Sequence, residues 1–347
     1  LSIFALITFF TFFIISKFSI KIKNGILLDN DYSKPQAFHD AAIPRCGGLA
    51  GYISLMIFLG IYFLLYSTIL FEYIFICSCL FLVGFLDDIK KNISPKKRLI
   101  LMIIFLVVLI NILPIKIFNI DLIFLNFWMQ NKFFSTLFIV LCFLFIVNGA
   151  NLVDGFNGLL TINLIIINSI LLFINLNNNA VEFSVLLTAQ IIIFLVFLMF
   201  NFPTAKIFLG DSGSYLFGSL TALNTVLTNN FNPSISSFFF CILLFYLFFE
   251  VFFSFIKKIY QKKSPFLPDD LHLHMLLYKR ILNNYDANKS NYYNSIIINL
   301  IFFFCILPSI YFADNSIFCK YWFFFLILIY TMIYYLLYYL TKKKIDI

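Results

Sequence analysis

The sequence predicts an all-α polytopic membrane protein with about eleven transmembrane helices, an outside N-terminus and a cytoplasmic C-terminus. Of its 347 residues, 62% are hydrophobic and only 12% are charged, whereas a soluble domain is about half apolar and a quarter charged. The mean hydropathy is +0.99. The Cys residues lie mostly inside apolar runs, so no disulfide framework is expected. We expect residues 1–347 to form one membrane domain.

The predicted spans follow from segment length. A membrane-spanning helix needs roughly 20 apolar residues. Two features interrupt this pattern. The connection at Glu72 between two expected spans is very short, and the span at 99–118 contains Pro114. The expected spans lie at about 1–20, 48–70, 71–86, 99–118, 134–153, 159–176, 184–200, 213–228, 235–256, 295–312 and 321–340.

Basic residues are distributed unequally between the two sets of loops. All but three of the 24 Lys and Arg residues lie in, or directly beside, loops that follow odd-numbered spans. The exceptions are Lys116, Lys132 and Lys320. Cytoplasmic loops of membrane proteins carry the excess of Lys and Arg, so the odd-numbered loops are predicted to face the cytoplasm.

Residues capable of chemistry follow the same asymmetry, since all three His fall in the predicted cytoplasmic loops. A channel or transporter places polar groups along a path near the bilayer midplane. Here only Glu250 lies deep in an apolar run, and it is a functional candidate or the partner of a neighbouring helix. The pattern favours chemistry between a lipid-borne and a water-soluble group. The loops concerned are about 21–47, 87–98, 154–158, 201–212 and 257–294.

The central stretch is Phe200–Ser219, FNFPTAKIFLGDSGSYLFGS, between two apolar segments. It holds one cation, Lys206, and one carboxylate, Asp211, in a turn rich in Gly, Ser and Pro. A carboxylate held at a membrane edge by glycine-permitted backbone suits a Mg²⁺ ligand that faces a phosphorylated substrate. A simple polar turn between two membrane helices is the alternative.

Two further loops carry carboxylates. Asp87 and Asp88 adjoin at the end of a span, and because adjacent carboxylates repel, one becomes available as a base or metal ligand. Asn148, Asn151 and Asp154 recur every three residues, roughly on one helical face. Amides there can bind a base or sugar, while Asp154 can bind metal or act in acid–base chemistry. A solvated helix end and a glycine-rich helix break are the respective alternatives.

The first and last cytoplasmic loops carry the remaining candidates. Lys34, His39 and Arg45 precede a Gly pair, and basic groups with exposed glycine amides suit a diphosphate. A linker with orienting charges is the alternative. His272 and His274 are two residues apart, with no Cys or third His nearby. This is a weak zinc pattern, and binding of sugar or phosphate fits better.

Together these loops resemble the polyprenyl-phosphate N-acetylhexosamine-1-phosphate transferase family, in the right order from about Lys34 to Lys279. The resemblance implies that a UDP-activated N-acetylhexosamine transfers its sugar 1-phosphate to undecaprenyl phosphate and releases UMP. It also implies a requirement for Mg²⁺, with Mn²⁺ as a substitute, and initiation of a cell-envelope glycan such as lipopolysaccharide at the bacterial cytoplasmic (inner) membrane. A membrane-lipid partner and no nucleic acid are expected, and a homodimer is left open.

The motifs transfer residue by residue. Asp211 matches the family's Mg²⁺ ligand, and Phe208 matches the ring that stacks on uracil. Asp87 and Asp88 match the pair beside the diphosphate and the lipid phosphate. The matches to the nucleotide motif and to the sugar- and phosphate-binding loop are Asn148, Asn151, Asp154, His272 and His274.

The chain departs from the family pattern at three loops. Asn157 stands where the family often has a second Asp, Ala37 and Phe38 stand where it has Arg-Lys, and the last loop reads DDLHLHM. Asn157 can still hydrogen-bond uracil. The absent triple-His signature and the eleven spans favour the aminosugar branch over UDP-MurNAc-pentapeptide as donor. A lipid-linked sugar transporter, a catalytically dead relative and a covalent phospho-Asp route remain open.

Overall fold

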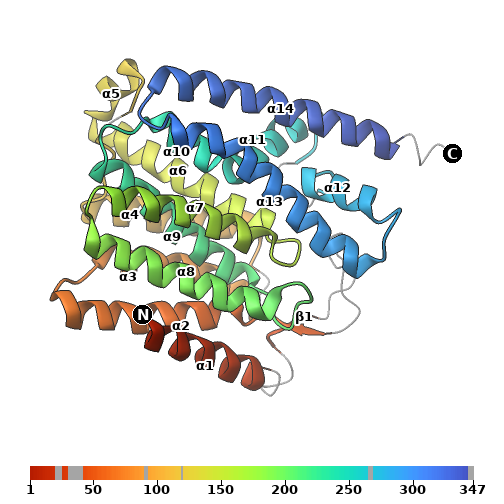
Figure 1. Ribbon diagram of the computed structural model, residues 1–347, viewed down its shortest axis with the longest axis horizontal. Coiled ribbons are helices and arrows are strands. Elements are labelled where there is room, and N and C mark those ends of the chain that lie inside the picture. The colour runs from red at the N-terminus through yellow and green to blue at the C-terminus, as the bar shows by residue number, and fades with distance from the viewer. Residues whose placement is uncertain (20–25, 30–41, 90–92, 119, 265–268, 343–347) are drawn as a thin grey trace.

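The computed structural model describes residues 1–19, 26–29, 42–89, 93–118, 120–264 and 269–342, and these form a helical bundle with one short β-hairpin (Figure 1). The hairpin pairs Leu28 with Pro44 in antiparallel register. The elements are α1 (Ser2–Ser19), β1 (Leu28–Asp29), β2 (Ile43–Pro44), α2 (Gly47–Tyr66), α3 (Phe71–Asp88), α4 (Pro95–Ile112), α5 (Ile123–Met129), α6 (Lys132–Val153), α7 (Leu159–Asn177), α8 (Val181–Asn201), α9 (Gly210–Phe231), α10 (Ser237–Leu243), α11 (Phe245–Tyr260), α12 (Leu273–Ile281), α13 (Ala287–Tyr311) and α14 (Ser316–Lys342).

A helix lies at each of the predicted spans, which agrees with a polytopic membrane protein. Among the described residues, 7 helices are long and apolar enough to cross a membrane, or up to 8 when a bent pair is taken as one span. The bent pair is α10 and α11, whose axes differ by 76°. The helices that pass singly are α1, α2, α6, α7, α8, α13 and α14.

The three other predicted spans are helices with more polar sequences. Helix α3 ends in Asp87 and Asp88, and α4 begins with a run of cations that ends at Arg98. Helix α9 differs, because every residue from Ser212 to Val226 is buried. It packs against α3, α6, α2 and α7. A helix enclosed by other helices does not face lipid, so it can carry polar residues without contacting hydrocarbon.

The polar residues of α9 bond to neighbouring helices. Asn168 of α7 donates to Thr221 at 3.0 Å, and Asn175, seven residues later, donates to Thr228 at 2.9 Å. Seven residues are about two helical turns, so the same pair repeats along one seam. Between the two pairs, Asn224 donates to the Asn168 side chain at 2.7 Å. Buried amides and hydroxyls are thereby satisfied inside the bundle.

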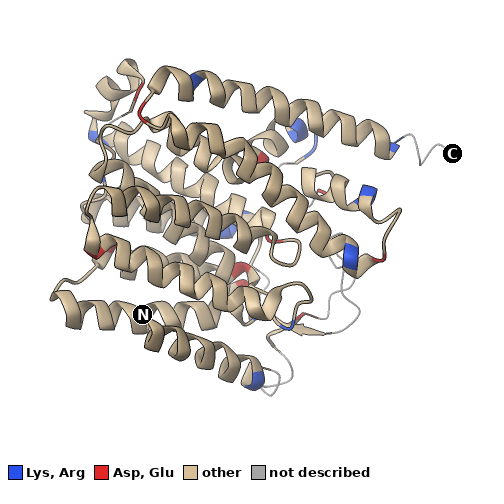
Figure 2. Ribbon diagram, viewed as in Figure 1, with Lys and Arg blue, Asp and Glu red and all other residues tan. Residues whose placement is uncertain are grey.

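The loops that carry the predicted chemistry lie at one end of the bundle. Figure 1 shows the hairpin, the turn after α6 and α12 at the end where the C-terminus emerges, while α5 lies at the opposite end. Figure 2 shows most Lys and Arg residues toward the former end. The described candidate residues are therefore gathered in the region that the charge pattern assigns to the cytoplasm.

Candidate active site

The site is built around the first turn of α9. Gly210 starts this helix in the left-handed region, with φ +76°, and Asp211 follows it. The carboxylate of Asp88, at the end of α3, accepts from the backbone N–H of Asp211 at 3.0 Å and of Ser212 at 2.9 Å. It also accepts from the Ser212 hydroxyl at 2.5 Å. Asp88 therefore caps α9 from a neighbouring helix and satisfies its free N–H groups and positive dipole end.

Glycines let three helix backbones meet at this point. A Cβ added at Gly84 of α3 would lie 2.4 Å from the carbonyl oxygen of Asp211. A Cβ at Gly48 of α2 would lie 2.3 Å from the backbone nitrogen of Gly213, and one at Gly210 would lie 2.6 Å from Asp88 Oδ2. Side chains at these positions would push α2, α3 and α9 apart.

The Asp211 side chain joins residues of three other helices. Its Oδ1 accepts from Asn151 Nδ2 of α6 at 3.0 Å. Its Oδ2 accepts from Arg98 of α4, and the same Arg98 nitrogen lies 3.1 Å from Asp87 Oδ2 of α3. The Asn151 amide also reaches Ser214 Oγ at 3.0 Å. Helices α3, α4, α6 and α9 thus each place one polar side chain at a common point.

Arg98 was not predicted as a site residue, because a cation at a cytoplasmic loop is already explained by membrane topology. In the structure it contacts Asp87 and Asp211. The one feature of the sequence that could have indicated this role is that Arg98 follows the carboxylate pair within the same short loop. Its Nε is buried with no partner among the described residues.

The three polar residues of the Asn-x-x-Asn-x-x-Asp motif have different hydrogen-bond partners, although their spacing is regular. Asn148 donates to the Leu144 carbonyl of its own helix at 2.7 Å, so only Asn151 bonds to Asp211. Asp154 ends α6, with its N–H donating to the Ala150 carbonyl at 3.1 Å. Burial, followed by the nearby charges of Asp211 and Asp88, raises the pKa of Asp154 well above its usual range.

The turn after α6 is tied to the loop that precedes α9. Asn157 Nδ2 donates to the Pro203 carbonyl at 2.9 Å. Gly158, in the left-handed region at φ +76°, donates its N–H to Asn201 Oδ1 at 2.7 Å. Asn201 in turn donates to the Ile207 carbonyl at 3.0 Å. The two candidate loops are therefore fixed relative to each other, with Asn157 and Asn201 as the links.

The end of the first cytoplasmic loop forms hydrogen bonds with the loop that precedes α9. Phe208 donates its N–H to the Pro44 carbonyl at 2.8 Å, and its own carbonyl accepts from Gly47 at 3.0 Å. Arg45 lies between these contacts, and its guanidinium pairs with Asp29 at 2.6 Å. Phe208 and Arg45 are thus placed beside the start of α9. The other candidates in this loop, Lys34 and His39, lie outside the described residues.

The histidines of the last loop pack beside the turn after α6. The rings of His272 and His274 stack with their centroids 5.4 Å apart, and the His274 ring meets Phe156 edge-on at 5.8 Å. The Tyr246 hydroxyl lies 3.2 Å from His274 Nδ1. Burial lowers the pKa of His274 to about 3, so this ring is neutral at physiological pH.

Comparison with known proteins relates this arrangement to a known family. The model of glycosyl transferase family 4 matches residues 70–229, which hold Asp87, Asn151 and Asp211. A Thermotoga maritima protein named undecaprenyl-phosphate alpha-N-acetylglucosaminyl 1-phosphate transferase is 29% identical over 274 residues, which is 78% of this chain and 79% of that protein. Residues 70–229 of the chain are therefore similar to glycosyl transferase family 4.

Two further relatives show how far the similarity extends along the chain. A Bacillus subtilis protein named probable undecaprenyl-phosphate N-acetylglucosaminyl 1-phosphate transferase is 27% identical over 332 residues, covering 94% of this chain and 88% of the relative. A Staphylococcus epidermidis phospho-N-acetylmuramoyl-pentapeptide-transferase is 30% identical over 200 residues, covering 54% and 62% respectively. The aminosugar relatives therefore align over more of the chain.

The side chains around Asp211 decide whether this site could hold a metal ion. Within the described part of the chain, no group of three or more His, Cys, Asp and Glu side chains is placed to hold one. Asp88 is occupied by the helix cap. Asp87 and Asp211, however, share one guanidinium, and Asn151 adds an amide. Mg²⁺ commonly uses one or two carboxylates and keeps several waters, so these side chains fit Mg²⁺.

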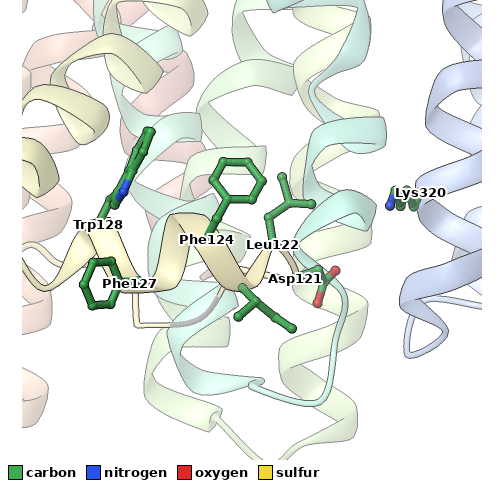
Figure 3. A pocket seen from close by; sticks show the side chains of 7 residues that line it. Asp121, Leu122, Phe124, Phe127, Trp128 and Lys320 are labelled. Atoms are coloured by element: carbon green, nitrogen blue, oxygen red, sulfur yellow. The ribbon is translucent and has the colours of Figure 1, made fainter.

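A separate hollow of about 710 Å³ lies at the opposite end of the protein, beside α5. Figure 3 shows side chains of the α5 segment, with Lys320 reaching toward it from α14. Because α5 and the start of α9 are at opposite ends of the bundle (Figure 1), this hollow takes no part in the site around Asp211. It is lined by Asp121, Leu122, Ile123, Phe124, Phe127, Trp128 and Lys320.

Proposed function

We propose that this protein transfers an N-acetylhexosamine 1-phosphate from a UDP-sugar to undecaprenyl phosphate, giving undecaprenyl-diphospho-sugar and UMP. The observation that carries the proposal is the convergence of Asp87, Arg98, Asn151 and Asp211 from four helices at one end of the bundle. Phosphoryl transfer depends mainly on positioning and on charge neutralisation. Two carboxylates with one guanidinium, fixed by helix ends, suit both needs.

The charges of the site explain how two anionic substrates can meet. The lipid phosphate and the donor diphosphate repel each other until cations neutralise them. Arg98 presents a planar fork of donors, of which Nε has no partner among the described residues. Asp87 and Asp211 hold the other side of this guanidinium. Arg98 is therefore placed to share its charge between the site carboxylates and a phosphate oxygen.

Asp211 and Asp87, with Asn151, are the residues that would hold Mg²⁺. When bound, the ion would neutralise diphosphate charge and stabilise the charge that develops during transfer. The chain's own contribution is rigidity, because Asp88 fixes the first turn of α9 and Asn151 fixes the Asp211 carboxylate. We assign Asp88 this capping role and keep Asp87 and Asp211 for contact with the substrates.

The reaction proceeds in this proposal by direct attack. A lipid phosphate oxygen attacks the β-phosphorus of the UDP-sugar, its bond forms as the bond to the UMP oxygen breaks, and UMP leaves. Asp87 is the residue that orients the attacking phosphate or accepts its proton. Asp88 is a poor candidate for a covalent nucleophile, because its oxygens already accept three hydrogen bonds.

The nucleotide is assigned to the turn after α6 and the loop before α9. Asp154, whose pKa is raised by burial and by neighbouring carboxylates, can donate to a carbonyl or phosphate oxygen when it is protonated. Phe208 presents an aromatic ring beside the start of α9 and is assigned to uracil. Asn157 supports the same pocket through its bond to Pro203.

The donor is best supported as an N-acetylhexosamine, because the relatives with that name align over most of the chain. UDP-MurNAc-pentapeptide is the second candidate, since relatives named for that activity match 41% to 54% of it. A transporter is less well supported. Asn168 and Asn175 of α7 bond to polar side chains of α9 instead of lining a path.

The proposed setting is the bacterial cytoplasmic membrane, with the site facing the cytoplasm where UDP-sugars are made. The unequal distribution of Lys and Arg supports this orientation. It also supports the eleven-span count, in which α3, α4 and α9 cross the membrane enclosed or flanked by the apolar helices. Reactivity of single Cys residues introduced into the loops toward an impermeant thiol reagent, in a background without native Cys, tests this topology.

The decisive experiment measures UMP release by the purified protein with undecaprenyl phosphate and Mg²⁺. UDP-N-acetylglucosamine, UDP-N-acetylgalactosamine and UDP-MurNAc-pentapeptide are supplied separately. Release with one aminosugar donor, dependent on the lipid, supports the proposal. Release with only the pentapeptide donor moves the protein to the second branch, and absence of release with every donor contradicts the transferase assignment.

A further inference from the structure

Glu250 is a buried carboxylate in an apolar helix that the proposed mechanism does not use. It lies on α11 and is only 1% exposed. Three donors surround it: His272 Nδ1 at 3.1 Å and the Leu273 N–H at 3.1 Å, both on Oε1, and the Tyr330 hydroxyl on Oε2. A carboxylate so deep in an apolar environment is costly unless every oxygen is paired. Packing of α11 against its neighbours would need only an apolar residue here.

A second contact on α11 anchors the same loop. Lys257, seven residues after Glu250, lies 2.6 Å from Asp269 and donates to the Leu271 carbonyl at 2.9 Å. Tyr334 of α14 also donates to that carbonyl, at 3.0 Å. The segment from Asp269 to Leu273 is thus held at both ends by side chains of the two helices. A loop that only connects two helices does not need contacts at both of its ends, so these contacts indicate that the position of the loop matters.

The fixed loop lies against the candidate active site. Gly149 of α6 packs so closely on α11 that a Cβ there would lie 2.2 Å from the Leu247 carbonyl oxygen. Glu250 follows this crossing by three residues on α11, and Asn151 follows it by two residues on α6. On the other side, His272 stacks on His274, which contacts Phe156 in the turn after Asp154. The Glu250–His272 pair therefore lies near the turn after Asp154, to which it is linked through His274.

We propose that Glu250 is a positioning residue that holds His272 through Nδ1 so that Nε2 faces the donor phosphates. This inference rests on the proposed transferase function. A carboxylate on Nδ1 keeps the proton on that nitrogen and fixes the ring orientation. Nε2 is then the ring atom left for a ligand. Tyr330 completes the arrangement by preventing the carboxylate from turning away from the ring.

The test compares full-length Glu250→Gln, His272→Ala and the double variant with the wild type. We expect Glu250→Gln to lower kcat about 10- to 100-fold, the range produced by losing the group that orients a functional histidine. Glu182→Gln is the matched control, because it makes the same change at an exposed residue of α8. The double variant should be no slower than His272→Ala alone, since Glu250 acts through that ring. Multiplied effects would overturn the proposal.

A spectroscopic measurement separates positioning from general stability. The chain has only 3 His, so ¹⁵N-histidine labelling gives few signals. We expect the His272 nitrogens to report a single Nδ1–H form in the wild type and a mixture of tautomers in Glu250→Gln. Unchanged nitrogen shifts would overturn the proposal. This result does not require turnover, so it stands apart from failure of the transferase assay.

A second variant covers the case in which Glu250→Gln does not fold. Tyr330→Phe leaves the carboxylate in place and removes the hydrogen bond that the Tyr330 hydroxyl donates to Oε2. We expect a roughly threefold to tenfold loss of kcat and a smaller change in the same nitrogen shifts. An unaltered kcat together with unaltered shifts would contradict the role assigned to the pair.

Discussion

Replacing Gly84 by Ala should lower the activity of the site although none of its functional side chains is replaced. The new Cβ would lie 2.4 Å from the Asp211 carbonyl oxygen, whereas ordinary contacts of this kind begin at 3.4 Å. The difference is about 1 Å, and backbone atoms cannot move aside as a flexible side chain can. Helix α3 must therefore shift by about that distance relative to α9, and Asp87 and Asp88 move with it.

The size of the effect follows from this displacement. A misplacement of about 1 Å at reacting groups can cost about 100-fold in rate, and overpacking a well-packed interface costs about 1–3 kcal/mol. We expect Gly84→Ala to lower UMP release by about two orders of magnitude while the protein still inserts and purifies. Turnover and thermal stability in the same detergent would be measured together.

A matched control is available in the same fold. A Cβ at Gly60 of α2 would meet nothing within 4 Å, so Gly60→Ala adds the same methyl group without a clash and should leave turnover unchanged. Equal, near-normal turnover in Gly84→Ala and Gly60→Ala would refute the idea that the close approach of α3 and α9 sets the site geometry.

Three further predictions concern single side chains. Asp211→Asn should reduce UMP release by about 1,000-fold or more at saturating Mg²⁺; near-normal turnover would remove its assigned role. Arg98→Lys should cost about 10- to 100-fold, because an ammonium cannot bridge Asp87 and Asp211 while also facing a phosphate; full activity would contradict the bridging role. Burial lowers the pKa of His274 from 6.5 to about 3. When the pH falls from 6.5 toward 3, the unfolded chain binds a proton at this residue and the folded chain does not, so the stability of the fold should decrease. Thermal inactivation of His274→Gln should depend less steeply on pH, and an unchanged slope would count against this explanation.

Local spacing predicted much of the candidate site. The stretch before α9 and the Asn-x-x-Asn-x-x-Asp motif placed Asp211 and Asn151 at helix ends, and the structure joins them by a hydrogen bond of 3.0 Å. The same reasoning predicted the same catalytic role for Asp87 and Asp88. Their different roles depend on α9, which follows Asp88 by more than 120 residues. No local pattern reveals that one carboxylate of an adjacent pair caps a distant helix.

The fold was predicted in outline for the same reason. Apolar length identified the helices, yet it could not reveal the 76° bend between α10 and α11, because apolar residues continue through Leu244 without a break. It also gave no sign of α5 or of the β-hairpin, which are shorter than any window of apolar residues. Arg98 was missed because a cation at a cytoplasmic loop already has an explanation in membrane topology.

The polarity of α9 connects fold and site. A helix with Asn, Thr, Ser and Gly along its length would be a poor membrane span alone, but every residue from Ser212 to Val226 is buried by neighbouring helices. Those neighbours, α3 and α6, are the helices that end in Asp87, Asp88 and Asn151. Enclosing α9 therefore brings the polar helix ends around Asp211 and holds them there before a substrate arrives. Preorganised charge of this kind costs no rearrangement during the reaction, which is the advantage that a buried polar helix offers to an enzyme acting on lipid-borne phosphates.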